Sequence, residues 1–257
     1  MPCSRNRSTR PALLQRLRSR YRTLPHFPPV LILAGGLGTR IRSICADLPK
    51  SLVPVNGEPF VAHQMRLLAR EGVRDVVMCV GHRSRPLIDF LGDGEQFGLN
   101  VRYSEDGDRL LGTGGAIVKA SALASSPFAV LYGDSYLDVP FGPVYETFVK
   151  SGKLGLMTVF RNENRFIPSN LLVENGLVTA YNKTNPTPNM VHADFGLSIY
   201  SAAAFAGRSQ TVFDLNEVVM NLIERRELAA FETLKRFYEV GSPEGVADLE
   251  QYLTQPH

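Results

Sequence analysis

Glycines and positive charges are combined between residues 34 and 50, and this combination points to phosphate chemistry. Residues 30–33 are apolar, as in a short buried strand. Glycines after a strand let backbone N–H groups approach a polyphosphate, and cationic side chains neutralise the remaining charge. A tight turn without a ligand would also use glycines, but three cations follow and no carboxylate precedes Asp47. We therefore predict an anion site, made from Ala34, Gly35, Gly36, Gly38, Thr39, Arg40, Arg42 and Lys50.

A second glycine-rich turn, Leu-Gly-Thr-Gly-Gly at residues 111–115, leads into a predicted helix over residues 116–123. The N-terminus of a helix attracts anions, although small residues there can also serve packing alone. Glu105 lies shortly before this turn. A carboxylate can accept hydrogen bonds from both N1–H and the 2-amino group of guanine, whereas a solvated Glu105 would have no such role.

Asp134 directly follows a predicted strand over residues 127–132. A carboxylate at the end of a parallel strand, beside phosphates, suits Mg²⁺. The alternative is an N-cap for the next segment, and we favour the metal. Asp138 fits no motif and is predicted to be a turn residue. The histidines and cysteines show no zinc-ligand spacing.

The elements that must position these residues alternate between strand and helix. Strands are predicted over residues 30–33, 75–80, 99–103 and 127–132, with helices over 58–70, 84–91 and 116–123. This order predicts an α/β, Rossmann-like, doubly wound and mostly parallel sheet, which binds ligands at the carboxyl ends of its strands. The later half adds strands at 154–160, 192–200, 228–232 and 237–240, a β-hairpin at 170–181 with an Asn-Gly turn, a helix at 214–226 capped by Asp214, and a last helix after residue 242.

Composition limits the alternatives. The chain has 257 residues and a net charge of only +3, and arginines are concentrated before residue 23, which argues against nucleic-acid binding by the remainder. Residues 1–29 are predicted to be a basic, disordered and non-catalytic extension, and residues 30–257 a single domain. Three scattered cysteines favour reduced thiols and a cytoplasmic location. No apolar run approaches the length of a membrane span.

Two stretches carry a family resemblance. Gly35 to Arg42, followed by Pro49-Lys50-Ser51-Leu52-Val53-Pro54-Val55, resembles the signature of the sugar-1-phosphate nucleotidyltransferases, and later motifs extend the likeness to about Leu253. The resemblance implies a nucleotide-diphospho-sugar transferase fold, with the hairpin as an insertion for the sugar. It also implies transfer of a nucleoside monophosphate from an NTP to a sugar 1-phosphate, releasing pyrophosphate. Relatives often form homo-oligomers, and many make precursors of lipopolysaccharide or capsule.

The resemblance also implies a role for individual residues. Arg40 would hold the pyrophosphate, and Lys50 would stabilise the charge on the α-phosphorus. Asp134 and Glu239 would hold Mg²⁺. Lys183, Asp194 and Gly196 would contact the sugar phosphate, with His192 as a further candidate for a sugar hydroxyl. The nucleotide contacts would be Ala34, Gly35, Gly36, Gly38, Thr39, Glu105, Gly112, Thr113 and Gly114.

The chain departs from the family pattern at two of these places. Asn182 replaces the usual glutamate before Lys183, and Glu239 replaces the usual aspartate of the metal pair. Glu105 with the following Leu-Gly-Thr-Gly-Gly segment is most similar to the heptose- and mannose-1-phosphate guanylyltransferases, so GTP is favoured. A uridylyl- or cytidylyltransferase on another sugar 1-phosphate, or a non-catalytic nucleotide-sugar-binding regulator, stays open as an alternative.

Overall fold

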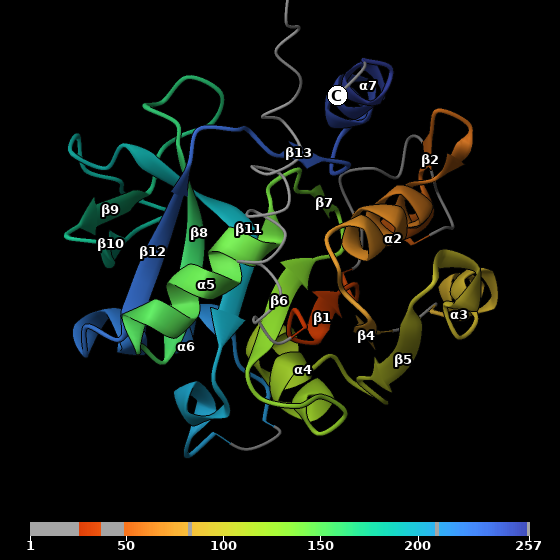
Figure 1. Cartoon of the computed structure of the whole chain (residues 1–257), viewed down its shortest axis with the longest axis horizontal. Coiled ribbons are helices and arrows are strands. Elements are labelled where there is room, and N and C mark those ends of the chain that lie inside the picture. The colour runs from red at the N-terminus through yellow and green to blue at the C-terminus, as the bar shows by residue number, and fades with distance from the viewer. Residues whose placement is uncertain (1–25, 37–48, 82–83, 209–210, 256–257) are drawn as a thin grey trace, which may run out of the picture.

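The computed structural model describes residues 26–36, 49–81, 84–208 and 211–255 (Figure 1). Its centre is a nine-stranded sheet in the order β5-β4-β1-β6-β11-β8-β12-β10-β9. The strands are β1 Val30–Leu33, β4 Asp75–Val80, β5 Asn100–Glu105, β6 Phe128–Tyr132, β8 Gly155–Arg161, β9 Leu171–Glu174, β10 Leu177–Tyr181, β11 His192–Tyr200 and β12 Leu228–Thr233.

One half of the sheet is parallel and the other is mixed. The strands β5, β4, β1 and β6 run parallel to one another, as predicted for alternating strands and helices. β11 is antiparallel to both of its main neighbours, β6 and β8, whereas β12 is parallel to β8. The predicted hairpin is confirmed as β9–β10, whose turn residues Asn175 and Gly176 have φ angles of 52° and 75°. Two positive φ values match the type I′ turn that an Asn-Gly pair favours.

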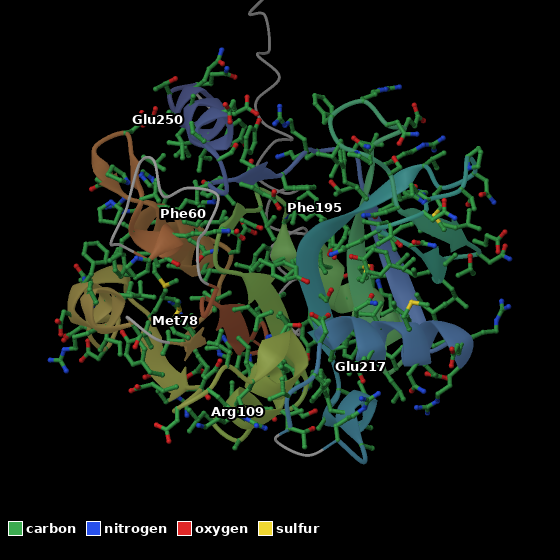
Figure 2. The ribbon with its side chains drawn as sticks, turned by 180° about the vertical axis from the view of Figure 1, so that it is seen from behind. Phe60, Met78, Arg109, Phe195, Glu217 and Glu250 are labelled. Carbon is green, nitrogen blue, oxygen red and sulfur yellow. The ribbon has the colours of Figure 1, made fainter. Side chains whose placement is uncertain are left out.

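Helices cover both faces of the sheet, and a third apolar cluster lies at one end of the molecule (Figures 1 and 2). Residues of α2, α3 and α5 pack on one face, and α4 and α6 cover the other. The third cluster joins α7 to the outer side of α2. The helices are α2 Phe60–Arg70, α3 Arg85–Leu91, α4 Gly112–Ser121, α5 Phe141–Ser151, α6 Leu215–Glu224 and α7 Pro243–Leu253. Short 3₁₀ turns are found at Lys50–Leu52, Glu95–Phe97 and Ala202–Phe205. The short strands outside the main sheet are β2 Pro54–Val55, β3 Glu58–Pro59, β7 Ser135–Tyr136 and β13 Tyr238–Glu239.

The structure changes some predicted boundaries. α5 was not predicted at all, and α4 begins four residues earlier than residue 116. Residues 27–29, which we assigned to the basic extension, pack on the domain: the rings of Phe27 and Phe141 have centroids 5.0 Å apart, and the Pro29 carbonyl accepts a hydrogen bond from the Ala129 amide. In the described part of the chain, no helix has the length and apolarity needed to cross a membrane.

Asp138 is a junction between three elements, so its prediction as a simple turn residue was wrong. Its carboxylate accepts hydrogen bonds from Arg70 of α2, Lys235 of the β12–β13 connection and Tyr252 of α7. Partial burial alone would raise the pKa of Asp138. The hydrogen bonds from Tyr252 and Lys235, with the charges of Lys235 and Arg70, outweigh this effect and lower the pKa below its ordinary value.

This shift gives a prediction for stability against pH. Because the folded-state pKa is lowered, Asp138 stabilises the fold above the ordinary aspartate pKa of about 4, and the contribution is lost as the pH falls through the folded-state pKa. Urea unfolding should therefore show Asp138→Asn to be less stable than wild type at pH 6, with the difference shrinking toward pH 3. The exposed Asp108→Asn is the control. A difference that does not change with pH would contradict the account.

Candidate active site

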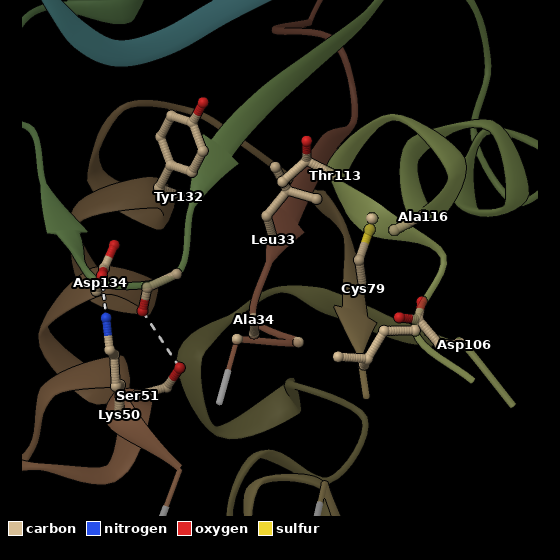
Figure 3. Close-up of a pocket in the computed structure, with 15 residues that line it drawn as sticks. Leu33, Ala34, Lys50, Ser51, Cys79, Asp106, Thr113, Ala116, Tyr132 and Asp134 are labelled. Atoms are coloured by element: carbon tan, nitrogen blue, oxygen red, sulfur yellow. Dashed lines mark hydrogen bonds and ion pairs between the residues drawn. The ribbon is translucent and has the colours of Figure 1, made fainter. Parts of the chain in front are cut away.

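A cavity of about 290 Å³ lies at the carboxyl ends of β1 and β6, and we call it the central cavity (Figure 3). The ion pair of Lys50 and Asp134 lies at one end and Asp106 at the other, while Tyr132 lies above. This is the position where an open parallel sheet binds ligands. Its lining contains Leu33, Ala34, Gly35, Gly36, Lys50, Ser51, Cys79, Asp106, Leu110, Gly112, Thr113, Ala116, Tyr132, Gly133 and Asp134.

Lys50 is held in place by the cavity wall. Its ammonium group lies 3.0 Å from Asp134 Oδ2, and both side chains are mostly buried, with 18% and 28% exposed. Lys50 begins a 3₁₀ turn that follows Pro49, and the Ser51 hydroxyl donates to the Gly133 carbonyl at 3.2 Å. The two loops that carry Lys50 and Asp134 are therefore joined by a side-chain ion pair and by a hydrogen bond.

A buried glutamine, which sequence reasoning missed, supports the Asp134 loop from the other side. Gln64 of α2 donates from Nε2 to the carbonyls of Tyr132 and Ser135, at 3.0 and 2.9 Å. The sequence contains a signal for this role, because Gln64 is a polar residue among the apolar residues of the predicted helix. The NH₂ group of a fully buried amide needs acceptors, and the two loop carbonyls supply them.

Besides Asp134, the carboxylate that lines the central cavity is Asp106, whereas the predicted Glu105 is not in the lining. Glu105 is the last residue of β5, is exposed, and does not line the cavity. Asp106 Oδ2 accepts a hydrogen bond from the Leu111 amide at 3.2 Å, which joins it to the second glycine-rich turn. Burial, with the nearby charge of Asp106, raises the pKa of the Cys79 thiol to about 12, so this cysteine of the cavity wall stays protonated.

The second glycine turn serves close packing as well as lining the cavity. Gly112 and Thr113 line the cavity, but the Gly114 amide donates to the Phe213 carbonyl at 3.0 Å. The Thr113 hydroxyl accepts from the Leu215 amide at 2.7 Å. A Cβ on Gly114 would lie 2.2 Å from the Phe213 ring, so only glycine fits there. Gly114 therefore serves packing, which was the alternative to anion binding, and its backbone N–H is used by the Phe213 carbonyl.

Replacing Gly114 with alanine should therefore destabilise the fold. Overpacking of this kind costs about 1–3 kcal/mol of unfolding free energy, since the Phe213 ring must move. Gly142→Ala in α5 is a matched control, because a Cβ there meets no atom within 4 Å and an alanine stabilises a helix by up to about 1 kcal/mol. Urea unfolding of both variants tests this. Equal stability of the two variants would contradict the packing argument.

The two predicted metal ligands face one cavity. A second cavity of about 450 Å³, the outer cavity, is lined by both Asp134 and Glu239. Glu239 is brought there by the two-residue ladder of β13 with β7, in which it lies opposite Ser135, and by the Val240 amide, which donates to the Asp134 carbonyl at 2.9 Å. Within the described residues, no group of three or more histidines, cysteines or acids is arranged so that it could hold a metal ion. Two carboxylates fit Mg²⁺, which keeps several waters and takes further oxygens from phosphates.

The three predicted sugar-phosphate residues also share a cavity. Lys183, Asp194 and Gly196 line a third space of about 580 Å³, the side cavity, which lies between β11 and α6. Asp194 is fixed by the Tyr181 hydroxyl at 3.1 Å and by the Gly196 amide at 3.0 Å. Gly196 has a φ of +94°, which favours glycine. Tyr132 lines both the side cavity and the central cavity, so the two spaces are neighbours.

Two other candidates have structural partners. The Asn182 side chain accepts from the Thr184 and Asn185 amides and so shapes the loop after the hairpin, although it also lines the side cavity. His192 is buried, its Nε2 lies 2.6 Å from Glu232 Oε2, and it is not in the lining of the side cavity, so its contact with a sugar hydroxyl stays a prediction. Glu232, which lies on β12, is therefore the hydrogen-bond partner of this side chain.

With this geometry in view, comparison with known proteins decides the family. The model of the nucleotidyl transferase family matches residues 29–169, which is more than half of the chain. The chain belongs to the nucleotidyl transferase family. The family match covers β1, the central cavity and Asp134, while Lys183, Asp194 and Glu239 lie beyond it.

Relatives of this nucleotidyl transferase include sugar-phosphate enzymes. It is 35% identical over 109 residues to D-glycero-alpha-D-manno-heptose 1-phosphate guanylyltransferase of Campylobacter jejuni, covering 42% of this chain and 48% of that protein. It is 30% identical over 202 residues to mannose-1-phosphate guanyltransferase of Candida albicans, covering 76% and 52%. The chain thus spans only about half or less of the length of the curated relatives it matches.

Solved structures confirm the fold of the nucleotidyl transferase. HddC from Yersinia pseudotuberculosis superposes with a TM-score of 0.72 at 24% identity, over 88% of this chain and 100% of that one. The inositol-1-phosphate CTP transferase from T. maritima gives 0.72 at 20% identity, over 90% and 98%. HddC has also been solved in complex with GMP-PN. The chain therefore has the predicted mixed α/β nucleotide-sugar transferase fold.

Most of the described candidate site residues are divided among the three cavities, and Glu239 lines the outer cavity with Asp134. Ala34, Gly35, Gly36, Gly112, Thr113, Lys50 and Asp134 share the central cavity, and Lys183, Asp194 and Gly196 share the side cavity. Glu105 and Gly114 are not brought to the cavity as contacts. Gly38, Thr39 and Arg40 lie outside the described residues, so their roles stay predictions.

Proposed function

We propose that this protein transfers a nucleoside monophosphate from an NTP, with GTP favoured, to a sugar 1-phosphate, giving an NDP-sugar and pyrophosphate. The observation that carries the proposal is the position of Asp134 and Tyr132 at the end of β6. Asp134 is shared by the central and outer cavities, and Tyr132 by the central and side cavities. A nucleotide in the central cavity would thus have a metal-ligand pair and a sugar site beside its phosphates.

In this reaction the protein would mainly position the two substrates and neutralise the charge of their phosphates. A sugar phosphate oxygen attacks the α-phosphorus in line, and pyrophosphate leaves. Lys50, already fixed by Asp134, would stabilise the charge that builds on the α-phosphate. Asp134 and Glu239 would hold Mg²⁺, which supplies neutralisation of phosphate charge. Lys183 would hold the incoming phosphate, which is already ionised and needs no general base.

For the nucleotide, we transfer the base-reading role from Glu105 to Asp106. Asp106 lines the central cavity at the end opposite Lys50 and Asp134, where a base would lie if its phosphates reach that pair (Figure 3). A carboxylate accepts the N1–H and 2-amino hydrogens of guanine, a pattern that uracil and cytosine lack. We further propose a cytoplasmic location, which the free thiol of Cys79 supports, and a product used for surface glycans.

A panel of four NTPs and several sugar 1-phosphates, with pyrophosphate release as the readout, tests this function. We expect the highest kcat/KM with GTP and either mannose or heptose 1-phosphate. Asp106→Asn should lower the preference for GTP over UTP. Binding of NTP without turnover of any sugar phosphate would contradict the proposal and favour a regulatory protein.

Lys183→Ala should raise KM for the sugar phosphate by about 10–100-fold, the scale of one charge-assisted hydrogen bond of about 1.5–3 kcal/mol. Its effect on KM for the NTP should be small, because Lys183 lines only the side cavity. Lys153→Ala is the control, since Lys153 pairs with Glu227 and lines none of the three cavities. Steady-state kinetics with each substrate varied in turn checks this, and an unchanged sugar-phosphate KM in Lys183→Ala would remove Lys183 from the site.

A further inference from the structure

The side cavity has an unequal distribution of charge. Its described lining contains one cation, Lys183, and three carboxylates. We call these carboxylates the acidic wall; they are Asp194, Asp214 and Glu217. Arg208 pairs with Glu217 at 2.7 Å, which leaves the carboxylates of Asp194 and Asp214 without a cationic partner among the described residues.

The N-terminus of α6, which could attract an anion to this wall, has its first N–H groups already hydrogen-bonded. α6 has ten residues and its N-terminus lies at the side cavity, so its free N–H groups would ordinarily favour negative charge. The Leu215 amide donates to the Thr113 hydroxyl at 2.7 Å, and the Asn216 amide donates to Asp214 Oδ1 at 2.8 Å. The Glu217 amide donates to the Asp214 carbonyl at 3.0 Å. The first three donors of the helix are therefore used within the protein.

The side cavity also contains neutral polar groups. Tyr132 lines it together with Asp194 and Asp214, and lines the central cavity as well. Asp194 itself keeps both oxygens engaged by neutral donors, the Tyr181 hydroxyl and the Gly196 amide. Glu217 lies on α6, on the face of the molecule shown in Figure 2. The hydroxyl and carboxylate groups of this cavity suit neutral, hydroxylated ligands.

We propose that the acidic wall is a charge filter, so that the side cavity accepts sugar 1-phosphates whose phosphate is their only negative group and disfavours sugars with a second anionic group. Lys183 serves the phosphate, and no second cation of the described lining remains for a carboxylate on the sugar. This inference rests on the proposed function, because it assigns the sugar to the side cavity. It disfavours uronic acid phosphates and N-acetylmuramate 1-phosphate as substrates, and favours neutral hexose or heptose phosphates.

The test uses two sugars that differ only at C6, which is a hydroxymethyl group in mannose 1-phosphate and a carboxylate in mannuronic acid 1-phosphate. Their dissociation constants are measured by calorimetry in the presence of a non-hydrolysable GTP analogue. A repulsion between like charges about 6 Å apart in a partly solvated site corresponds to roughly a tenfold weaker binding of the uronate. Higher salt should reduce this ratio, because the wall is partly exposed.

Asp214→Asn is the decisive variant, because asparagine caps a helix as well as aspartate but carries no charge. We expect the ratio to fall to about threefold or less. Glu224→Gln makes the same change of net charge at the other end of α6, away from the cavity lining, and should keep the wild-type ratio.

The outcomes separate the two proposals. Equal binding of both sugars to wild type, or a ratio that Asp214→Asn leaves unchanged, overturns the charge filter. The expected ratios without any pyrophosphate release on mannose or heptose 1-phosphate would support the filter and contradict the proposed function. Binding of neither sugar would remove the side cavity as a sugar site and overturn both.

Discussion

Replacing Lys50 with methionine should lower kcat for NDP-sugar formation by about 10²–10³, the scale of losing one positioned electrostatic group. The Lys50 ammonium is fixed 3.0 Å from Asp134 at the end of the central cavity, where the α-phosphate of a bound nucleotide would lie. A charge that stabilises the transition state more than the bound substrate affects kcat more than KM. We therefore expect a much smaller change in KM for the NTP.

Two companion variants make this result interpretable. Lys50→Arg keeps the charge but replaces a compact ammonium with a planar group, so partial activity is expected. Lys150→Met removes an exposed cation of α5, outside the central cavity, and should leave kcat unchanged. Thermal unfolding of Lys50→Met should resemble that of wild type, because Asp134 is partly exposed and stays hydrated. Full turnover by a folded Lys50→Met would end its assignment as a catalytic residue.

Replacing Asp134 with asparagine should have a comparable effect on kcat, about 10²–10³, and should also move the Mg²⁺ titration. Asp134 and Glu239 are two of the three carboxylates that line the outer cavity beside the central one, and the third, Asp248, is paired with Arg236. Loss of a group that only orients a metal ligand costs about 10–100-fold in affinity, so loss of a ligand should shift the Mg²⁺ midpoint at least tenfold. Activity measured across Mg²⁺ concentrations checks this.

Glu239→Gln should shift the same titration in the same direction, because Glu239 lines the outer cavity with Asp134 and lies opposite Ser135, the next residue, in the β7–β13 pair. Asp138→Asn provides the matched control. It makes the same chemical change four positions from Asp134, but Asp138 binds Arg70, Lys235 and Tyr252 and lines none of the three cavities. A wild-type Mg²⁺ titration in Asp134→Asn would exclude Asp134 as a metal ligand.

Much of the fold could be predicted because it depends on local signals. Buried strands such as β1 and β4 are continuous apolar runs, and the Asn175-Gly176 pair specifies its own turn. α5 was missed because Pro140, Gly142 and Pro143 look like a loop. Proline is tolerated in the first turn of a helix, because an N–H at that position has no intrahelical partner. The first turn of α5 can therefore contain Gly142 and Pro143, with Pro140 as its N-cap.

The site was harder to predict where it depends on contacts between distant residues. Asp106 faces the central cavity and Glu105 does not, since a shift of one position changes the direction of a side chain at a strand end. The contact between the buried His192 and the exposed Glu232 joins strands far apart in the sequence, and no sequence spacing predicts it. The residues with a shared motif, Lys50, Asp134 and Gly196, were placed in cavities as the sequence led us to expect.

The central claim is that the α-phosphoryl group of the nucleotide is transferred to a sugar phosphate. The most direct measurement follows the label of [α-³²P]GTP and of [γ-³²P]GTP in separate reactions with mannose or heptose 1-phosphate and Mg²⁺. The account predicts that the α label appears in the NDP-sugar and the γ label in pyrophosphate. Release of the γ label as inorganic phosphate, or an α label that never enters a sugar nucleotide with any of the four NTPs, would contradict it.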